Sequence, residues 1–189
     1  TLYWDSRNRL WIGTRNNGLN LFVPNNKNGF ISFQNNVDNP NSIASNIIRA
    51  IHEDRIGNVW IATKNGLDLL PKAEIDKNNP IFKHFQYDED DDLGISQNSI
   101  YSFLEDSHGN FWAGTWSAGV NHIQSGRRNF KHYYQKATQN SLSHNSASCF
   151  VQDEDMVWIG TEGNGLNLFN PVESSFKFFT HDPDRKSVV

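Results

Sequence analysis

The chain has 189 residues, of which 37% are hydrophobic and 13% aromatic, with 13 Phe, 6 Trp and one Met. This composition favours short strands joined by polar turns, with aromatic side chains supplying the packing. The net charge of −4 argues against a nucleic-acid partner, and no apolar run approaches membrane-spanning length. Nucleic-acid binding and direct membrane contact are therefore not expected.

One pattern returns four times along the chain. It is centred on a Trp followed by a small residue and a Thr, as in WIGT, WIAT and WAGT, at spacings of 49, 52 and 46 residues. Self-similarity at this period indicates a propeller or a solenoid. The repeated residues are Trp11, Trp60, Trp112 and Trp158, preceded by Asp5, Asp54, Asp106 and Asp153 and followed by Gly18, Gly66, Gly119 and Gly165.

Each copy contains four strand-length segments separated by Gly, Asn, Asp and Pro. In the second copy these segments are 47–54, 58–63, 66–70 and 81–85, which predicts an antiparallel meander. A four-stranded sheet cannot bury both faces alone, so neighbouring sheets must stack. The sequence therefore predicts an all-β fold, a β-propeller segment of four four-stranded antiparallel blades. The expected blades are 1–37, 38–89, 90–137 and 138–182, with 183–189 leading into a further blade.

Structural roles account for the repeated residues. Asp54 and Asp106 are expected to accept backbone N–H groups in the first hairpin turn of each copy, where Gly57 and Gly109 supply a positive φ. Asn8 replaces this Gly in the first copy. The four Trp side chains are expected to lie between blades. Small residues two positions after each Trp are expected to keep the opposite face of the sheet thin; they are Gly13, Ala62, Gly114 and Gly160.

The motif I-x-E-D-x-x-G-N-x-W-I-G-T-x-x-x-G-L-N-L-F resembles the two-component regulator propeller repeat, and the resemblance covers essentially the whole chain. The chain departs from this motif in two copies. The fourth copy reads QDEDMVW and lacks the turn Gly, and the third reads WSAGVNHI. The family implies the periplasmic sensor region of a hybrid two-component histidine kinase of Bacteroidetes, with oligosaccharide ligands. It also implies a larger ring, often seven-bladed, from which this chain is a slice without the kinase core. Remaining blades or a second copy would then cover the two free blade faces.

Candidate ligand-binding residues are those that break the repeat at one end of the propeller. This end carries the segment leading into each innermost strand and the turn between the second and third strands. Trp116 is the one aromatic residue in these turns and is a candidate for stacking on a sugar ring; the alternative is that it packs on a neighbouring loop. Arg15, Lys64 and Glu162 occupy the corresponding turns of the other copies and are candidates for hydrogen bonds to hydroxyl or acidic groups.

The segments leading into the innermost strands add further candidates. Their recurring Asn residues, Asn46, Asn98 and Asn145, are expected to fix the loops through local backbone bonds. Arg49, Tyr101 and Ser148 share one position but differ in chemistry, which makes them candidates for lining the central channel. His144 lies close by, and an ordinary surface role is its alternative.

Other chemistry finds little support in the sequence. The acidic run 87–94 places its Gly wrongly for an EF-hand, which favours a solvated loop, and the seven His residues show no metal-ligand spacing. Cys149 lies in an apolar strand and is expected to be a buried, inert thiol. No metal, cofactor or catalytic residue is therefore predicted.

The resulting hypothesis is an extracytoplasmic, oligosaccharide-sensing segment that signals through a binding-induced conformational change. One alternative is a protein-interaction propeller that uses its blade edges or loop face as a scaffold. Another is a propeller glycan hydrolase or lyase, which needs a convergent acid–base cluster on the loop face.

Overall fold

The computed structural model describes residues 1–24, 29–124, 129–137 and 140–181. The expected lead into a further blade at 183–189 lies outside these residues. Within them, all regular secondary structure is β-strand, and sixteen strands form four four-stranded sheets. No helix of the described chain is long and apolar enough to cross a membrane.

Each sheet is an antiparallel meander of four consecutive strands, and we call the sheets blades 1 to 4. Blade 1 contains β1 (Leu2–Trp4), β2 (Leu10–Gly13), β3 (Leu19–Phe22) and β4 (Phe30–Phe33). Blade 2 contains β5 (Ile48–Glu53), β6 (Val59–Thr63), β7 (Gly66–Leu70) and β8 (Lys83–Phe85). Blade 3 contains β9 (Ile100–Glu105), β10 (Phe111–Thr115), β11 (Val120–Ile123) and β12 (Phe130–Tyr133). Blade 4 contains β13 (Ala147–Asp153), β14 (Met156–Thr161), β15 (Leu166–Asn170) and β16 (Ser175–Phe179).

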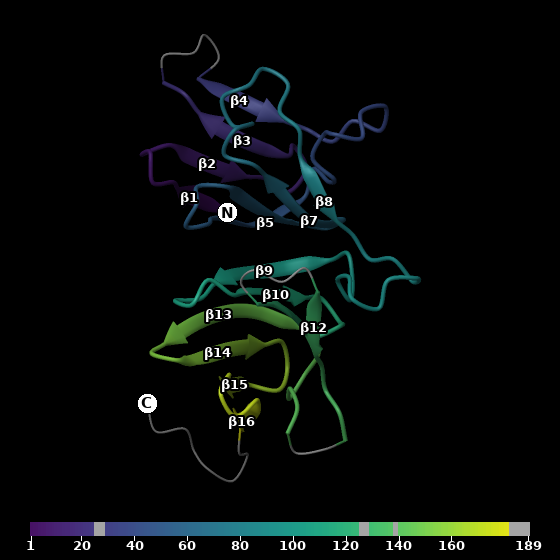
Figure 1. The fold of residues 1–189 in the computed structure, drawn as a ribbon. Coiled ribbons are helices and arrows are strands. Elements are labelled where there is room, and N and C mark those ends of the chain that lie inside the picture. Colours follow the sequence, from purple (N-terminus) through teal and green to yellow (C-terminus); the bar gives the residue numbers. More distant parts are fainter. Residues whose placement is uncertain (25–28, 125–128, 138–139, 182–189) are drawn as a thin grey trace.

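The blades stack in chain order, with blade 1 at one end of the molecule and blade 4 at the other (Figure 1). The first strands of successive blades, β5, β9 and β13, lie next to one another and form the inner edge of the stack. These features confirm the predicted propeller segment of four antiparallel blades. They also confirm the four predicted strands of the second copy, although the last begins later because the Phe82 N–H donates to the Asn41 carbonyl oxygen.

The hydrophobic core lies between the blades in three clusters, which contain Trp11, Trp60 and Trp112. Trp11 packs with Ile48 and Ile51 of blade 2, and Trp60 packs with Ile100 of blade 3. In the same way Trp112 packs in one cluster with residues of blade 4. Because each Trp is on a second strand and contacts the following blade, it joins two sheets that share no backbone hydrogen-bond ladder. The predicted position of these three Trp side chains is confirmed.

The small residues after the Trp lie on a different face from the one predicted. A Cβ added to Gly13 would come 2.5 Å from the Ile48 side chain of blade 2, and one added to Gly114 would come 2.4 Å from the Ala147 carbonyl oxygen of blade 4. Residues two apart on a strand share a face, so these positions share the face of the Trp. The expectation that they thin the opposite face was therefore wrong. They let the inner strand of the next blade approach beside the Trp.

Gly114→Ala is expected to lower the free energy of unfolding by about 2 kcal/mol, because the new methyl group overlaps backbone of blade 4 and the two blades must separate. Equilibrium denaturation by guanidinium chloride measures the change. Gly94→Ala is the matched control, since its methyl group would meet only Asp91 at 3.0 Å or more. An equal loss of stability in both variants would contradict close blade contact at Gly114.

Cys149 differs from its prediction and is exposed. A Cβ added to Gly160 would lie 2.4 Å from its Sγ atom, so Cys149 shares the face of Gly160 and Trp158 on blade 4. On blades 1 to 3 the equivalent face packs against the following blade. The prediction of a buried thiol was therefore wrong, because apolar neighbours along a strand do not show whether another sheet covers that face.

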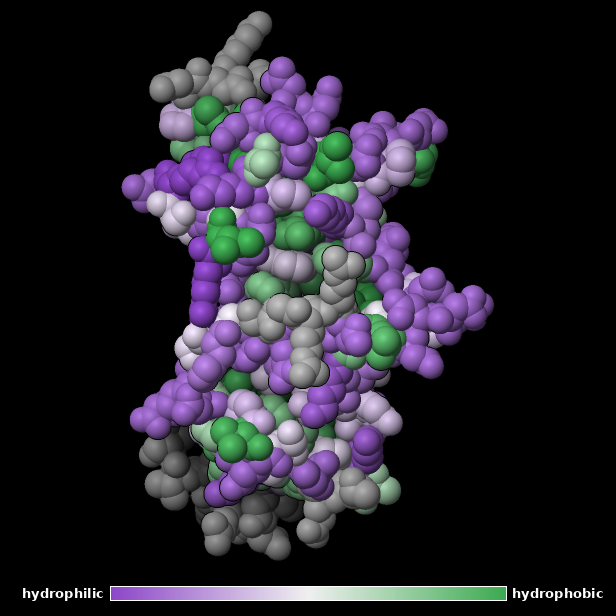
Figure 2. All heavy atoms as spheres, in the orientation of Figure 1, coloured by the Kyte–Doolittle hydropathy of each residue, from purple (hydrophilic) through white to green (hydrophobic). Residues whose placement is uncertain are grey.

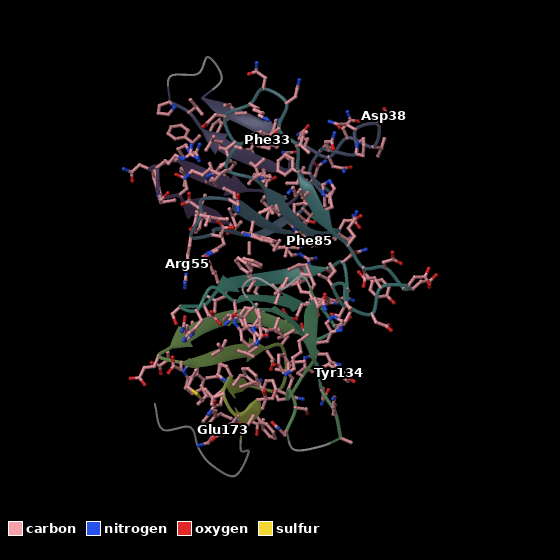
Figure 3. All side chains as sticks on the ribbon, in the orientation of Figure 1. Phe33, Asp38, Arg55, Phe85, Tyr134 and Glu173 are labelled. Carbon is pink, nitrogen blue, oxygen red and sulfur yellow. The ribbon has the colours of Figure 1, made fainter. Side chains whose placement is uncertain are left out.

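The blades have two distinct ends. The loop end carries the turns between second and third strands and the segments leading into β5, β9 and β13; the hairpin end carries the turns between first and second strands. Figure 3 shows Asp38 projecting on the side of the loop end and Arg55 on the opposite side. The face of the molecule shown in Figure 2 is mostly hydrophilic, with apolar residues scattered between polar ones.

Candidate ligand-binding site

The repeated Asp residues are occupied by structural bonds at the hairpin end. Asp54 Oδ1 accepts the backbone N–H groups of Ile56 and Asn58 at 3.1 and 2.8 Å, and its Oδ2 accepts the indole N–H of Trp60 at 2.9 Å. Asp5 and Asp106 make the same set of bonds. Asn8, Gly57 and Gly109 take positive φ values of 58°, 87° and 79° in these turns. The predicted turn role of Asp and Gly is confirmed, and the carboxylate also holds the Trp.

Burial alone would raise the pKa of Asp106, but hydrogen bonds from Trp112 and Asn110 outweigh it and hold the pKa below its usual range. Asp153 of blade 4 lacks this environment, since the one hydrogen bond recorded for its side chain in the described chain is from Trp158 Nε1 at 3.5 Å. The bond between the repeated Asp and Trp is therefore weaker in the fourth copy than in the first three.

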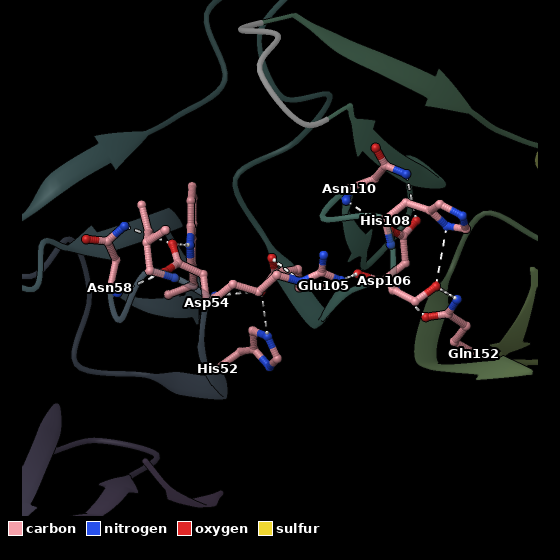
Figure 4. Close-up of polar contacts among 12 residues, drawn as sticks. His52, Asp54, Asn58, Glu105, Asp106, His108, Asn110 and Gln152 are labelled. Carbon is pink, nitrogen blue, oxygen red and sulfur yellow. Dashed lines mark hydrogen bonds and ion pairs between the residues drawn. The ribbon is translucent and has the colours of Figure 1, made fainter. Parts of the chain in front are cut away.

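A second set of bonds at the hairpin end joins successive blades and was missed by the sequence interpretation. Glu53 accepts the backbone N–H of Ser6 at 2.6 Å, and Glu105 accepts that of Arg55 at 3.1 Å. Gln152 accepts that of Ser107 at 2.6 Å, so the acceptor in each case is the residue before the repeated Asp of the next blade. Figure 4 shows this junction between blades 2, 3 and 4. The Glu of the E-D pairs in the motif is the sequence signal for these bonds, whereas the sequence interpretation assigned a role to the Asp alone.

Glu105 also binds side chains of blade 2. The Arg55 Nε atom lies 3.3 Å from one of its carboxylate oxygens and His52 Nε2 lies 3.6 Å from the other. Burial lowers the pKa of His52, and the nearby Glu105 carboxylate opposes that shift. These contacts join blade 2 to blade 3, so the charges of Arg55 and Glu105 have a structural role that needs no ligand.

The loop end is fixed by the recurring Asn residues, as predicted. Asn46 Oδ1 accepts the N–H of Asn35, and Asn98 Oδ1 accepts that of Tyr87. Asn145 Oδ1 accepts the N–H of Gln135 in the same way. Their carbonyl oxygens accept N–H groups from the Gly residues of the preceding blade, which are Gly18, Gly66 and Gly119. These Asn residues therefore hold the loops in place and join the blades.

Three inner strands carry a β-bulge at the loop end. The pairing register shifts between Ile48 and Ala50, which leaves Arg49 as the extra residue, and it shifts at Tyr101 and Ser148 in the same way. A bulge redirects the side chain of its extra residue and is frequent next to functional sites. The variable position found in the sequence is thus the one whose side chain the fold turns out of the regular sheet pattern.

Arg49, Tyr101 and Trp116 form one stack across blades 2 and 3. The guanidinium carbon of Arg49 lies 3.8 Å from the Tyr101 ring centroid, and the Tyr101 and Trp116 rings stack with centroids 5.0 Å apart. Arg49 Nη1 donates to Ser99 Oγ at 2.7 Å, which fixes the guanidinium. Burial lowers the pKa of Arg49. Trp116 packs on a neighbouring residue and still keeps 47% of its surface exposed.

A cavity of about 500 Å³ adjoins this stack at the loop end, between blades 1, 2 and 3. Arg15 from the blade 1 turn, Lys64 from the blade 2 turn, Arg49 and Tyr101 all line it. Four of the seven residues proposed for ligand binding are therefore brought together, and Trp116 contacts one of the four. This arrangement offers three cationic groups and an aromatic surface within one cavity of a size typical for small ligands.

The other candidates lie apart from this cavity on blade 4. Glu162 Oε2 accepts a bond from Ser146 Oγ at 3.4 Å, and His144 Nδ1 accepts the N–H of Ser146 at 3.1 Å. Ser148 donates to the Gly160 carbonyl oxygen at 3.2 Å. These contacts are local to blade 4, so the structure does not assemble all the candidates into one site.

A second cavity and the acidic loop both lie apart from the seven candidates. A cavity of about 640 Å³ between blades 2 and 3 is lined by Trp60, Phe85, Phe111 and Phe130, whose rings pack these blades together, and by none of the seven candidates. Asp88 to Asp92 are exposed, as predicted for a solvated loop. In the described residues, no group of three or more His, Cys, Asp or Glu is placed to hold a metal ion.

The family model described as two component regulator propeller matches residues 1–16, 42–65 and 94–117. Each of these segments contains the repeated Asp and Trp of one blade. The chain carries two-component regulator propeller repeats. This regulator propeller segment is 30% identical to histidine kinase P4 of Formosa agariphila, over 88% of this chain and 15% of that protein.

Solved structures also resemble this regulator propeller segment. It matches the extracellular domain of a putative hybrid two-component system of B. thetaiotaomicron with a TM-score of 0.80 and 22% identity, over 95% of this chain and 24% of that one. A second such domain from the same organism matches with a TM-score of 0.74 and 24% identity, over 94% and 24% of the two chains. These structures support the propeller fold. The regulator propeller segment spans about a quarter of these domains and less of the kinase.

Proposed function

We propose that this chain is part of the ligand-sensing, periplasmic region of a hybrid two-component histidine kinase, and that its ligand is an oligosaccharide. The regulator propeller repeats and the likeness to extracellular domains of such systems support the class of protein. The single observation that carries ligand binding is the cavity that gathers Arg15, Arg49, Lys64 and Tyr101 beside the exposed Trp116.

The chemistry of this cavity suits a sugar. Trp116 and Tyr101 offer broad, rigid ring surfaces at little cost in conformational entropy, and the cations around them donate hydrogen bonds to hydroxyl groups. Catalysis by acid and base groups is less well supported, because the lining of the cavity, within the described part of the chain, includes no carboxylate and no His.

Signalling follows from where the site lies. Arg49 belongs to blade 2 and Tyr101 to blade 3, so a ligand that contacts both changes the free energy of packing between these blades. A ligand shifts a conformational equilibrium only by its difference in affinity for the two states, and a site across a blade junction provides such a difference. The proposed readout is a change in packing that the rest of the receptor transmits.

Isothermal titration calorimetry of the chain against a panel of glycan oligosaccharides tests this function. Trp116→Ala is expected to weaken binding about ten-fold, because the variant loses an aromatic stacking surface worth about 1 to 2 kcal/mol. Trp4→Ala is the matched control, since Trp4 is a similarly exposed Trp at the hairpin end of blade 1. Equal affinity of the Trp116 variant and the unchanged protein, or no binding of any oligosaccharide, would refute the proposal for this site.

A further inference from the structure

The cavity at the loop end carries an unbalanced positive charge. Its ionisable side chains are the cations Arg15, Arg49 and Lys64 and the phenol of Tyr101, and no Asp or Glu is among the described residues that line it. The whole chain has a net charge of −4, with 21 acidic and 17 basic residues, so a local set of three cations runs against the overall balance. Charges that are not neutralised by the protein favour a partner of opposite sign.

Several basic side chains elsewhere in the described chain are paired. Arg7 and Arg9 bind Asp76, Arg55 binds Glu105, and Lys77 binds Glu74. No ion pair is recorded for any of the three basic residues of the cavity, although all three belong to the described residues. Unpaired cations that converge on one cavity are placed to hold an anion.

Arg49 is the most strongly positioned of the three. Its Nη1 atom donates a hydrogen bond to Ser99 Oγ and lies 3.4 Å from the Ile100 carbonyl oxygen. Its guanidinium group also stacks on the Tyr101 ring. A guanidinium has five N–H donors, and these recorded bonds use Nη1 alone. A planar donor group held in this way loses little side-chain entropy when it binds a carboxylate or a sulfate group.

We propose that the ligand of this cavity is an anionic saccharide, whose carboxylate or sulfate group binds among Arg15, Arg49 and Lys64 while its ring lies against the Tyr101–Trp116 stack. The inference rests on the proposed oligosaccharide-sensing function and specifies the class of sugar. A neutral oligosaccharide would leave three cations without an anionic partner, among them the half-buried Arg49, which lowers its affinity.

Matched pairs of sugars test the charge requirement by calorimetry. One arm uses a tetramer of galacturonic acid and its fully methyl-esterified form; the other uses a sulfated galactose tetramer and its desulfated form. We expect at least one acidic tetramer to bind ten-fold or more tightly than its neutral counterpart, and this preference to weaken as salt rises. The arm that shows the preference identifies carboxylate or sulfate as the recognised group.

Variants locate the effect. Lys64→Gln and Arg15→Gln are each expected to weaken binding of the acidic tetramer about five-fold or more and to leave its neutral counterpart unchanged. Lys77→Gln makes the same charge change on an exposed side chain in the loop that follows β7, at the hairpin end, and is expected to have no effect. Unchanged unfolding midpoints show that the variants are folded.

The outcomes separate this proposal from the proposed function. Equal affinities for the acidic and neutral forms, with Trp116→Ala weakening both, would overturn the anionic ligand and leave oligosaccharide sensing in place. An acidic preference that persists in the Lys64 and Arg15 variants would overturn this cavity as the site of the anion. Absence of binding by all four tetramers would overturn the anionic ligand, and absence of binding by every oligosaccharide of the panel would overturn both proposals.

Discussion

Asp106→Ala is expected to lower the free energy of unfolding by about 4 kcal/mol. The carboxylate accepts the indole N–H of Trp112 at 2.9 Å, the Asn110 side chain at 2.9 Å, and the backbone N–H groups of His108 and Asn110. Trp112 is completely buried, so its indole N–H cannot donate a hydrogen bond to water when the carboxylate acceptor is removed. A buried donor left without a partner costs about 1 to 3 kcal/mol, and loss of the turn bonds adds to this.

Equilibrium unfolding followed by Trp fluorescence and by circular dichroism measures the change. The repeat provides its own control, since Asp153→Ala removes the equivalent residue of blade 4, where the recorded contact is long and exposed. That variant is expected to lose about 0.5 kcal/mol or less. Similar losses for both residues would show that the bond to a buried Trp is not what makes the Asp important.

His122→Leu is expected to stabilise the protein by about 1 kcal/mol near pH 7 and by about 3 kcal/mol more at pH 4. His122 is 6% exposed, both of its ring nitrogens are buried without a hydrogen-bond partner, and its ring stacks on Trp112 with centroids 4.0 Å apart. The other three blades place a Leu opposite the Trp at this position, namely Leu21, Leu69 and Leu168. Leu therefore fits the site without a polar group to desolvate.

The pH dependence follows from the direction in which the pKa moves. Burial lowers the pKa of His122 to about 4, with the Lys131 ammonium adding to this effect and Asp106 opposing it. Below the ordinary His pKa of about 6.5, the unfolded chain binds a proton that the folded chain does not accept until about pH 4. Stability is thus lost as pH falls from about 6.5 to about 4, by about 1.4 kcal/mol for each pH unit that separates the pKa values of the unfolded and folded chains.

Urea denaturation of the unchanged protein and the variant at pH 4, 5, 6 and 7 tests this expectation. The stability difference should widen steadily as the pH falls. His108→Leu serves as the control, because it makes the same substitution at a His whose side chain is 62% exposed. Parallel profiles for the His122 variant and the unchanged protein would show that the pKa of His122 is not lowered in the folded chain.

The fold could be predicted because the interactions that build one blade are close in sequence. Asp54 reaches Ile56, Asn58 and Trp60 within six residues, and the positive φ of Gly57 is a property of the same turn. A pattern this local leaves its full signature in every copy. Four copies in register therefore predicted the strands, the turns and the position of Trp11, Trp60 and Trp112 between blades.

The candidate site was predicted only as a set of residue types at one end of the propeller. Variation among the copies pointed to Arg15, Arg49, Lys64, Tyr101 and Trp116. It pointed equally to Glu162 and His144, which the structure places on blade 4, away from the cavity. Differences between copies show where the fold does not require a residue, but they carry no distances between one blade and the next.

Residues that are distant in the sequence determine the parts that only the tertiary structure decided. The β-bulge that redirects Arg49, its contact with Tyr101, and the Glu105 bonds to blade 2 all depend on how a strand pairs or how two blades approach. The faces of Gly114 and Cys149 were misjudged for the same reason, since burial there depends on whether another sheet lies against that face. Local hydrogen bonds and turn geometry are written in each repeat, whereas contacts between blades arise only when the sheets pack together.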